Sequence, residues 1–368
     1  MIRKVYLKYL LDRLRKESFF SFFKYGYRYV FTYISFKTNR SFSGPIQGTL
    51  CLTYNCNLKC KMCDLPMRHL NYNNDPDLIN LTLTEWKQII DDFSKMSTSA
   101  IAISGGEPLL NHEVYSIIKY IKDSKMIAQM TSNGWFITPD VADKIILSQL
   151  DGISISIDAE TEKVHDKIRG FKGSFKKAFE AIANLDDSRK KYKSDITISI
   201  STTFGKFNYN SMKSLIELAK TSATDRIGFI PVHNIAPLLN DDEMNMSRLE
   251  TEEIFIKITE LQNLAKEDNF IETSERYLQL FHDFFQGKPL PQKCMAGFTT
   301  LVVDCYGRIF PCFSFYEMEK SWGNIREFKK GLYSFWKSKE IQSKRKSINS
   351  CRDCYWNCQV ETNLLYKW

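Results

Sequence analysis

The 368-residue chain lacks any uncharged apolar run long enough to span a lipid bilayer. Its amino terminus is basic, but charged residues interrupt the apolar run there and no small-residue cleavage site follows, so no signal peptide is evident. Without a secretory route, disulfide bonds are not expected to explain the ten cysteines. We therefore expect a cytoplasmic protein, and the length favours about two domains.

Cysteine is absent between Cys63 and Cys294, which divides the cysteines into two groups. Histidine is scarce, with five residues scattered along the chain, and a single histidine is more often structural than catalytic. We therefore assign no catalytic acid or base. Grouped cysteines in a chain without secretory features indicate metal ligands instead.

The first group contains Cys56, Cys60 and Cys63, on a loop that leaves a strand-like segment at 49–53. Thiolates are soft ligands that suit iron–sulfur clusters, zinc or copper(I). A closed structural zinc site needs four ligands, and this loop offers three. Three thiolates on a four-iron cluster would leave one iron open to a substrate or cofactor. The alternatives are a zinc knuckle or cysteines that serve as small buried hydrophobic residues.

A second motif, Gly105-Gly106-Glu107-Pro108, follows a strand candidate at 100–104. The cysteine loop and this motif, in this order and each after a strand, resemble the radical S-adenosylmethionine (radical SAM) superfamily. The resemblance implies that the three cysteines hold a [4Fe–4S] cluster whose open iron binds S-adenosylmethionine. Reductive cleavage would then give a 5′-deoxyadenosyl radical that abstracts hydrogen from a substrate.

The resemblance also implies a set of S-adenosylmethionine contacts: Gly105, Gly106, Glu107, Pro108, Ser132, Asn133, Ser156, Asp158 and Arg169. Glu107 would accept a hydrogen bond from the methionine ammonium, and the glycines would let the backbone approach closely. Ser156 and Asp158 would bind ribose hydroxyls, and Arg169 would face the carboxylate. The structural alternatives are a helix cap for Asp158, a surface ion pair for Arg169 and a turn at Asn133-Gly134.

The chain alternates strands and helices from residue 47 to 245, with strand candidates at 49–53, 100–104, 127–131, 152–158, 196–202 and 227–232. One of the helices is expected to open with Thr138 as its cap and Pro139 in its first position. This pattern predicts an α/β fold, a partial (β/α)6 radical SAM barrel. Isoleucines alternate with serines in 152–158. If the isoleucines face the outer helices, the inner face is small and polar and suits a polar ligand. The alternative is an antiparallel sheet with one exposed face.

A bridging helical segment is expected at 246–290, and a small domain of a β-hairpin plus helix at 291–368. The pattern around this domain's six cysteines resembles the SPASM/twitch extension of radical SAM enzymes. The resemblance implies one auxiliary [4Fe–4S] cluster held by Cys294, Cys312, Cys351 and Cys354, with Cys358 as the alternative to Cys354. Cys305, in a strand beside the hairpin turn, is expected to pack in the core and not to bind metal. A zinc ribbon is the alternative for this region.

The predicted function is a radical SAM enzyme that acts on a small-molecule, sugar or lipid substrate and takes electrons from a partner such as flavodoxin or ferredoxin. The first alternative is a maturase of a ribosomal peptide or protein. Such enzymes often carry an additional winged-helix domain, and residues 1–46 are too short and aromatic for one. The second alternative, a non-enzymatic iron–sulfur or zinc protein, would not need the Gly-Gly-Glu-Pro motif or a polar barrel interior.

The net charge of +8 comes from residues 1–40, which hold ten basic and two acidic residues, so the rest of the chain sums to zero. No nucleic-acid partner is therefore expected for the enzyme body. Residues 1–46 form a predicted arm, with an amphipathic helix at 2–16 and ten aromatic residues between Phe19 and Phe36. We expect residues 1–40 to lie on the inner membrane surface. The alternative is that the aromatic side chains pack against the open side of the barrel.

Overall fold

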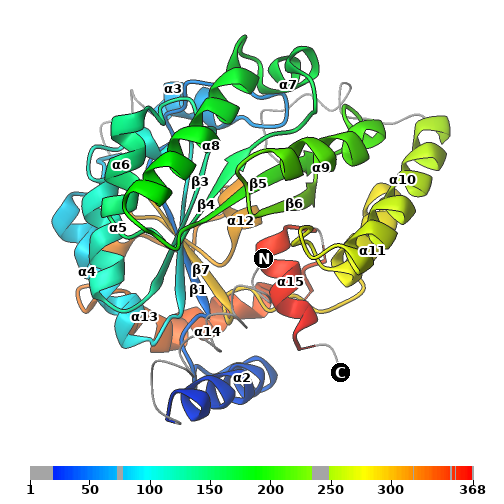
Figure 1. Cartoon of the computed structure of the whole chain (residues 1–368). Helices are drawn as coiled ribbons and strands as arrows, with labels where there is room; N and C mark the ends of the chain where they lie inside the picture. The colour runs from blue at the N-terminus through cyan, green and yellow to red at the C-terminus, as the bar shows by residue number, and fades with distance from the viewer. Residues whose placement is uncertain are drawn as a thin grey trace.

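The computed structural model describes residues 20–72, 78–233, 248–317, 319–348, 350–352 and 354–366. One eight-stranded sheet has the order β6-β5-β4-β3-β2-β1-β7-β8. Its first six strands in the chain are parallel neighbours: β1 (Gln47–Cys51), β2 (Ala100–Ser104), β3 (Ile127–Ser132), β4 (Gly152–Ser156), β5 (Thr197–Phe204) and β6 (Arg226–Pro231). The sheet begins at β6 and ends at β8 and these two strands do not pair, so the predicted α/β partial barrel is confirmed and is not closed (Figure 1).

The helices between these strands are α3 (Leu65–Tyr72), α4 (Leu83–Lys95), α5 (Val114–Asp123), α6 (Pro139–Leu147), α7 (Glu162–Arg169), α8 (Ser174–Lys191) and α9 (Met212–Thr221). The predicted start of α6 is confirmed, because the Thr138 hydroxyl accepts a hydrogen bond from the Val141 backbone N–H and Pro139 occupies the first turn. Helices α4, α5, α6 and α8 lie along the outer side of the sheet (Figure 1). The short helix α7 was not predicted from the sequence.

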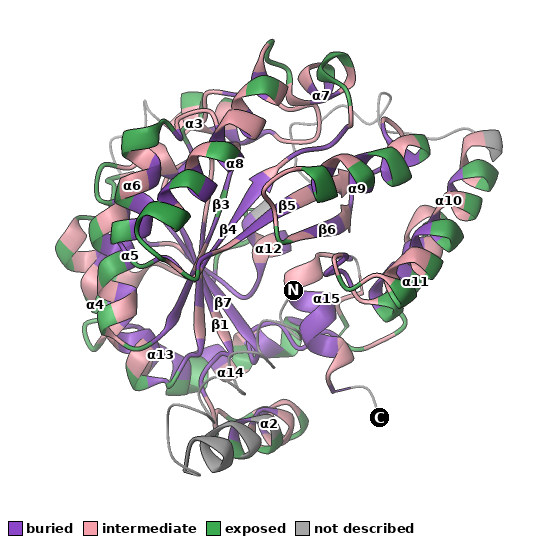
Figure 2. Cartoon of the chain, in the orientation of Figure 1, coloured by how far each residue is buried: buried purple, intermediate pink, exposed green. Residues whose placement is uncertain are grey.

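The two faces of the sheet differ as the alternating pattern predicts. Ile153 and Ile155 are buried, and a Cβ atom on Gly134 would touch both Ile155 and residues of α8, so these isoleucines face the outer helices. On the inner face, Ser154 and Ser199 share a hydrogen bond of 2.8 Å between their hydroxyls. The strands are mostly buried, as Figure 2 shows. The sheet therefore turns a polar face inward and an apolar face towards the helices.

The C-terminal hairpin is confirmed and continues the barrel sheet. After α10 (Arg248–Glu267) and α11 (Glu275–Phe285), β7 (Thr300–Asp304) pairs in parallel with β1 and antiparallel with β8 (Ile309–Phe310). A parallel neighbour needs a long crossover connection, and the bridging helices lie within it. The hydrogen-bonded sheet thus runs across the proposed domain boundary at residues 290 and 291.

The α-helices that follow β8 are α12 (Phe313–Glu317), α13 (Gly331–Lys337), α14 (Lys339–Arg345) and α15 (Asn357–Leu364). Helix α15 packs on α11 beside the inner side of the sheet (Figure 1). Glu361 of α15 accepts hydrogen bonds from the Ser274 backbone N–H at 2.9 Å and from its hydroxyl at 2.8 Å, at the start of α11. The C-terminal segment therefore covers the open side of the partial barrel.

Helix α2 (Phe20–Thr38) is the first described element, and the predicted helix at 2–16 lies outside the described residues. Arg28, one of the arm's basic residues, is buried and donates hydrogen bonds to the Ser99 hydroxyl and the Pro45 carbonyl, both at 2.7 Å. The Phe36 ring contacts the Phe298 ring edge-to-face. This part of the arm packs at the amino ends of the strands. Of the helices in the described ranges, none has the length and apolar character to cross a membrane.

Candidate active site

The loop of Cys56, Cys60 and Cys63 is held between two glycine contacts. A Cβ atom on Gly106 would lie 2.1 Å from the Asn55 carbonyl oxygen, and one on Gly170 would lie 2.1 Å from the Lys59 carbonyl oxygen. These separations are far below van der Waals contact, so only glycine allows this approach. The Gly-Gly-Glu-Pro loop thus packs on one side of the cysteine loop, and the end of α7 packs on the other.

Glu107 lies beside this loop and is 1% exposed. Its carboxylate accepts hydrogen bonds from the Ser132 hydroxyl at 2.9 Å, the Asn133 backbone N–H at 2.8 Å and the Leu109 backbone N–H at 3.2 Å. Burial raises the pKa of Glu107 to about 7, although these donors act in the opposite direction. The Asn133 side-chain amide lies 3.9 Å from the Cys56 sulfur. Glu107, Ser132 and Asn133 therefore form one network next to the first cysteine.

Arg169 and Asp158 meet on the other side of the loop. The Arg169 Nε atom lies 2.7 Å from Asp158 Oδ2, and its Nη1 atom lies 3.9 Å from the Cys60 sulfur. Asp158 is fully buried, and its Oδ1 atom accepts a hydrogen bond from the Thr203 backbone N–H at 2.9 Å. The Asp158 carboxylate thus faces Arg169. It is not the cap of α7, because Thr161 is the N-cap residue of that helix. Burial raises the pKa of the Cys60 thiol, while Arg169 lowers it.

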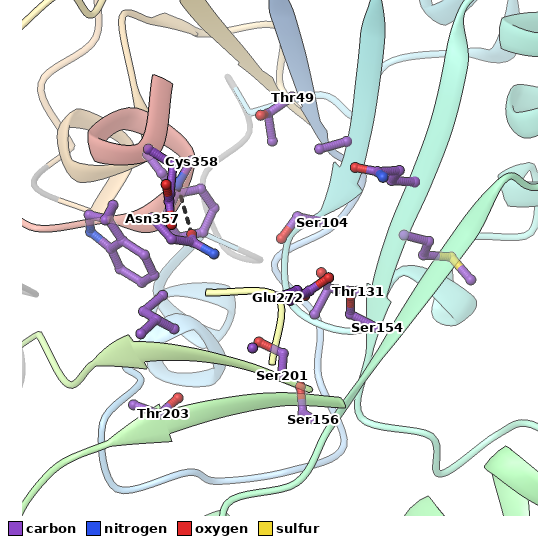
Figure 3. Close-up of a pocket in the computed structure, with 18 of the residues that line it drawn as sticks. Thr49, Ser104, Thr131, Ser154, Ser156, Ser201, Thr203, Glu272, Asn357 and Cys358 are labelled. Carbon is purple, nitrogen blue, oxygen red and sulfur yellow. Dashed lines mark hydrogen bonds between the residues drawn. The ribbon is translucent and has the colours of Figure 1, made fainter. Parts of the chain in front are cut away.

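A cavity of about 260 Å³ lies between the inner face of the sheet and the C-terminal segment. The sheet side is lined by small hydroxyl side chains: Thr49, Ser104, Thr131, Ser154, Ser156, Ser201 and Thr203 (Figure 3). Glu272, on a segment bridged to β6, also lines the cavity, and the C-terminal segment contributes Trp356, Asn357 and Cys358. Arg169 also lines the cavity and so connects it to the cysteine loop. The sequence predicted the polar wall, but it gave no signal for Glu272 or Trp356.

Five C-terminal cysteines lie near one another. Cys294 is hydrogen-bonded to Cys351 and lies within electrostatic reach of Cys312 and Cys354. Burial raises the pKa of the Cys312 thiol, and the neighbouring thiols Cys354, Cys358 and Cys351 raise it further. Cys358 differs from the other four because it also lines the cavity.

Cys305 lies apart from this group. Burial raises the pKa of its thiol, and its nearest electrostatic neighbours are Asp304, Arg308 and the Tyr54 backbone. The sulfur is buried in the main hydrophobic core. Cys305 therefore packs in the core, as the sequence predicted.

Both cysteine sets fit iron–sulfur clusters by donor chemistry, with three thiols in one set and at least four in the other. Within the ranges given above, no three His, Cys, Asp or Glu side chains converge closely enough to bind one metal ion. A four-iron cluster distributes its thiolates over different irons, so it does not need that convergence.

A buried junction joins the two cysteine-bearing regions. The Tyr54 hydroxyl, two residues before Cys56, donates a hydrogen bond of 3.1 Å to Asp304 and accepts one of 2.7 Å from Arg308. Arg308 also pairs with Asp304 at 2.7 Å, and Asp304 is fully buried. No sequence motif indicated this junction, because its members are about 250 residues apart in the chain.

Comparison with known proteins gives matches over most of the chain. The radical SAM superfamily model matches residues 50–219, and the SPASM model, an iron–sulfur cluster-binding domain, matches residues 294–355. An AdoMet-dependent heme synthase of Methanosarcina barkeri is 26% identical over 79% of this chain and 81% of its own length. The mycofactocin maturase MftC of Mycolicibacterium smegmatis is 34% identical, but the match covers 40% of this chain and 36% of that protein.

Solved structures show the same fold. The crystal structure of Streptococcus suis SuiB bound to the precursor peptide SuiA has a TM-score of 0.64 at 15% identity, and the match covers 86% of this chain and 70% of that one. The structure of anSMEcpe with bound AdoMet has a TM-score of 0.58 at 16% identity, over 86% of this chain and 88% of that one. At these identities the likeness concerns the fold.

The two family matches cover both regions in which the cysteines gather. The auxiliary region is therefore an iron–sulfur cluster-binding domain, and the zinc-ribbon alternative for it is wrong. The non-enzymatic alternative is also wrong, because the first region is a radical SAM domain and its relatives are enzymes. The chain belongs to the radical SAM superfamily, as an enzyme that uses S-adenosylmethionine and carries a C-terminal SPASM iron–sulfur domain.

Proposed function

We propose that Cys56, Cys60 and Cys63 hold the catalytic cluster and that the cavity beside them binds the substrate. When bound, the cluster and S-adenosylmethionine supply a 5′-deoxyadenosyl radical that abstracts hydrogen from the substrate. The protein positions both molecules and excludes water. The observation that carries the proposal is the contact of Arg169 with both Cys60 and the cavity.

Each proposed cofactor contact has a distinct task. Glu107, oriented by Ser132 and Asn133, accepts a hydrogen bond from the amino group of S-adenosylmethionine. Gly105, Gly106 and Pro108 shape the loop against which the methionine part lies. Arg169 binds the carboxylate, and Ser156 in the cavity wall binds a ribose hydroxyl. We assign Asp158 to orient Arg169, because its carboxylate already faces that guanidinium.

We infer that Cys294, Cys312, Cys351 and Cys354 hold the auxiliary cluster. The contacts of Cys294 reach the other three thiols but do not include Cys358, which lines the cavity as well as lying near Cys312 and Cys354. Anaerobically reconstituted protein is then expected to bind about eight irons in two clusters. Cys354→Ala loses about half of this iron, whereas the Cys358→Ala control keeps about eight. If Cys358→Ala loses iron and Cys354→Ala keeps it, Cys358 is the fourth ligand and Cys354 is not.

The substrate we favour is a small polar molecule such as a sugar. The cavity is small, its sheet side contains seven serine and threonine hydroxyls, and α15 covers its open side. Ligand pockets for drug-sized molecules are usually about 300–1,000 Å³, so this volume suits a small substrate. A lipid substrate would place its polar head group against this wall, because the hydroxyls can form hydrogen bonds with a head group but not with an acyl chain.

A peptide is the second candidate. The relatives include a protein named as a maturase, and the SuiB structure contains a precursor peptide. A peptide would need to insert only one side chain into the cavity. The two candidates differ in the size of the molecule that is consumed.

The test begins with 5′-deoxyadenosine release by the reconstituted enzyme with dithionite and S-adenosylmethionine. Cys60→Ala is expected to abolish release, and Glu107→Ala is expected to weaken cofactor binding. Cell extract separated by size is then added, and mass spectrometry follows which component is lost. Loss from the small-molecule fraction supports the first candidate, and loss from the peptide fraction supports the second. Unchanged cleavage by Cys60→Ala would refute the mechanism.

We further propose that a flavodoxin or ferredoxin reduces this enzyme in the cytoplasm, and that residues 1–40 bring it to the inner membrane surface. The support for membrane association is the concentration of basic and aromatic residues in this arm. Arg28 does not contribute its charge to that surface, because its guanidinium is buried in hydrogen bonds to the enzyme body. The remaining basic residues would provide the attraction.

A further inference from the structure

A second basic segment adjoins the arm in the folded chain. Residues 329–346 contain seven lysines and arginines and one acid, Glu340. Five of the lysines are exposed to solvent: Lys329, Lys330, Lys337, Lys339 and Lys346. The one arginine, Arg345, is buried. The segment contains α13 and α14, which lie near α2 at one end of the molecule (Figure 1).

Hydrogen bonds join the two segments. The Asn39 side-chain amide donates to the Gln342 carbonyl at 2.8 Å, and the Ser41 hydroxyl donates to the Trp336 carbonyl at 2.7 Å. The Trp336 indole N–H donates to the Ser43 carbonyl at 2.8 Å. Segments that are 293 to 303 positions apart in the chain are therefore held side by side by these hydrogen bonds.

Exposed apolar side chains accompany the lysines. Tyr27, Val30 and Phe42 are 51%, 50% and 44% exposed, and the Phe31 ring lies 4.2 Å from that of Tyr27 and 6.4 Å from that of Phe42. A hollow of about 160 Å³ beside them is lined by Tyr27 and Phe42 together with Lys95 and Lys337. Apolar side chains grouped on a surface often mark an interaction site. Here they are mixed with basic groups, as at a lipid–water boundary.

We propose that α2 and the α13–α14 segment form one face that docks on an anionic membrane. This inference rests on the membrane association proposed for residues 1–40 and adds a second, discontinuous contact to it. The face matches an anionic lipid surface in charge, and lysines near such a surface add to binding. Nucleic acid is the other polyanion that a basic face attracts. The exposed side chains of Val30 and Phe42 favour lipid instead, because neither carries a polar group.

The position of this face is compatible with catalysis. Helix α2 contacts Pro45 and Ser99, which precede β1 and β2, whereas the cysteine loop follows β1. The docking face and the cysteine loop therefore lie at opposite ends of the strands. Gln47, at the start of β1, lines the cavity. A docked membrane would leave the cofactor loops uncovered while the cavity extends towards the docking face.

The test measures sedimentation of the full-length protein with vesicles of phosphatidylcholine alone or with phosphatidylglycerol. The α13–α14 variant replaces Lys337, Lys339 and Lys346 by Ser. A control replaces Lys144, Lys193 and Lys213 by Ser, because these lysines are also exposed but lie outside the proposed face. The wild type is expected to pellet with anionic vesicles and to be released by salt. The α13–α14 variant is expected to bind at least about tenfold more weakly, and the control within about twofold of wild type.

A third variant, with Arg3, Lys4 and Lys8 replaced by Ser, separates this inference from the earlier proposal. If only this variant loses binding, the arm alone contacts the membrane and the inference of a joint face is overturned. If the wild type ignores anionic vesicles, both proposals fail. Binding to a DNA duplex but not to vesicles would overturn a lipid partner. Urea unfolding of each variant confirms that weaker binding does not reflect unfolding.

Discussion

At the scale of single residues, the site depends on a buried carboxylate. Glu107 has three hydrogen-bond donors, yet burial leaves its pKa near neutrality, at about 7. A carboxylate in this state gains from a cationic or donor group that enters the site. Its hydrogen-bonded neighbours fix its orientation before a ligand binds. These features support the proposed contact of Glu107 with an amino group, and a pKa of about 7 makes its charge depend on pH near neutrality.

S-adenosylmethionine binding should therefore strengthen as pH rises. With a pKa of about 7, Glu107 is about one-tenth ionised at pH 6 and about nine-tenths ionised at pH 8. Because the ionised form accepts from the amino group, the affinity of the cluster-loaded protein is expected to rise about tenfold between these values. Titration by isothermal calorimetry measures it. Glu107→Gln should bind more weakly at both pH values, and a full pH dependence in that variant would place the titrating group elsewhere.

At the scale of elements, two loops and the end of α7 determine where the cysteines lie. The Lys61 backbone N–H donates to the Ile168 carbonyl at 2.9 Å, and the Gly106 backbone N–H donates to the Thr53 carbonyl at 2.7 Å. Gly170 ends α7 with a φ of 66°, a left-handed conformation that favours glycine. The cysteine loop is thus positioned by backbone contacts from both sides. These contacts involve no cysteine side chain.

Gly170→Ala should therefore damage the cluster loop without removing a ligand. The new methyl group would overlap the Lys59 carbonyl oxygen, so the loop has to move. Gly173→Ala is a matched control, because Gly173 also has positive φ, 85°, but no atom beyond its neighbours in the chain lies within 4 Å of the added carbon. The control is expected to lose about 1–2 kcal/mol of unfolding free energy. Gly170→Ala should also lose about half the bound iron, and equal iron in both variants would disprove the steric argument.

At the scale of the whole molecule, the radical SAM region and the C-terminal region share one sheet and one core. Strand β7 pairs with β1 along five residues, and the main hydrophobic cluster includes residues of both regions. Tyr54 of the radical SAM region also hydrogen-bonds to both members of the Asp304–Arg308 ion pair in the C-terminal region. The two regions are therefore expected to unfold together, because neither can separate without breaking the sheet.

Arg308→Met should lower the stability of both regions at once. It leaves the fully buried Asp304 carboxylate without its cation, which typically costs about 3–5 kcal/mol. Arg326→Met is the control, because its ion pair with Glu85 also links the two regions but lies at the surface, where pairs contribute about 0–1 kcal/mol. Urea unfolding followed by tryptophan fluorescence and far-UV circular dichroism should give coincident transitions. Separate transitions would show that the two regions unfold independently.

The sequence by itself determined the local features. The six barrel strands, the cap at Thr138 and the polar inner face followed from patterns of neighbouring residues, because periodicity and turn chemistry are local properties. The two cysteine groups and the Gly-Gly-Glu-Pro motif indicated the family, since their spacing along the chain reflects the chemistry of a cluster loop. Both predictions are confirmed by the sheet order and by the family matches.

Only the tertiary structure decided how distant segments meet. It placed β7 beside β1, turned Asp158 towards Arg169 and brought Cys358 into the cavity wall as well as near the other C-terminal cysteines. It also placed α2 beside α13 and α14, which no local pattern could indicate. These arrangements depend on which buried surfaces and polar groups fit together across hundreds of residues. Burial and pairing depend on the complete fold, so they become visible only when the whole chain is packed.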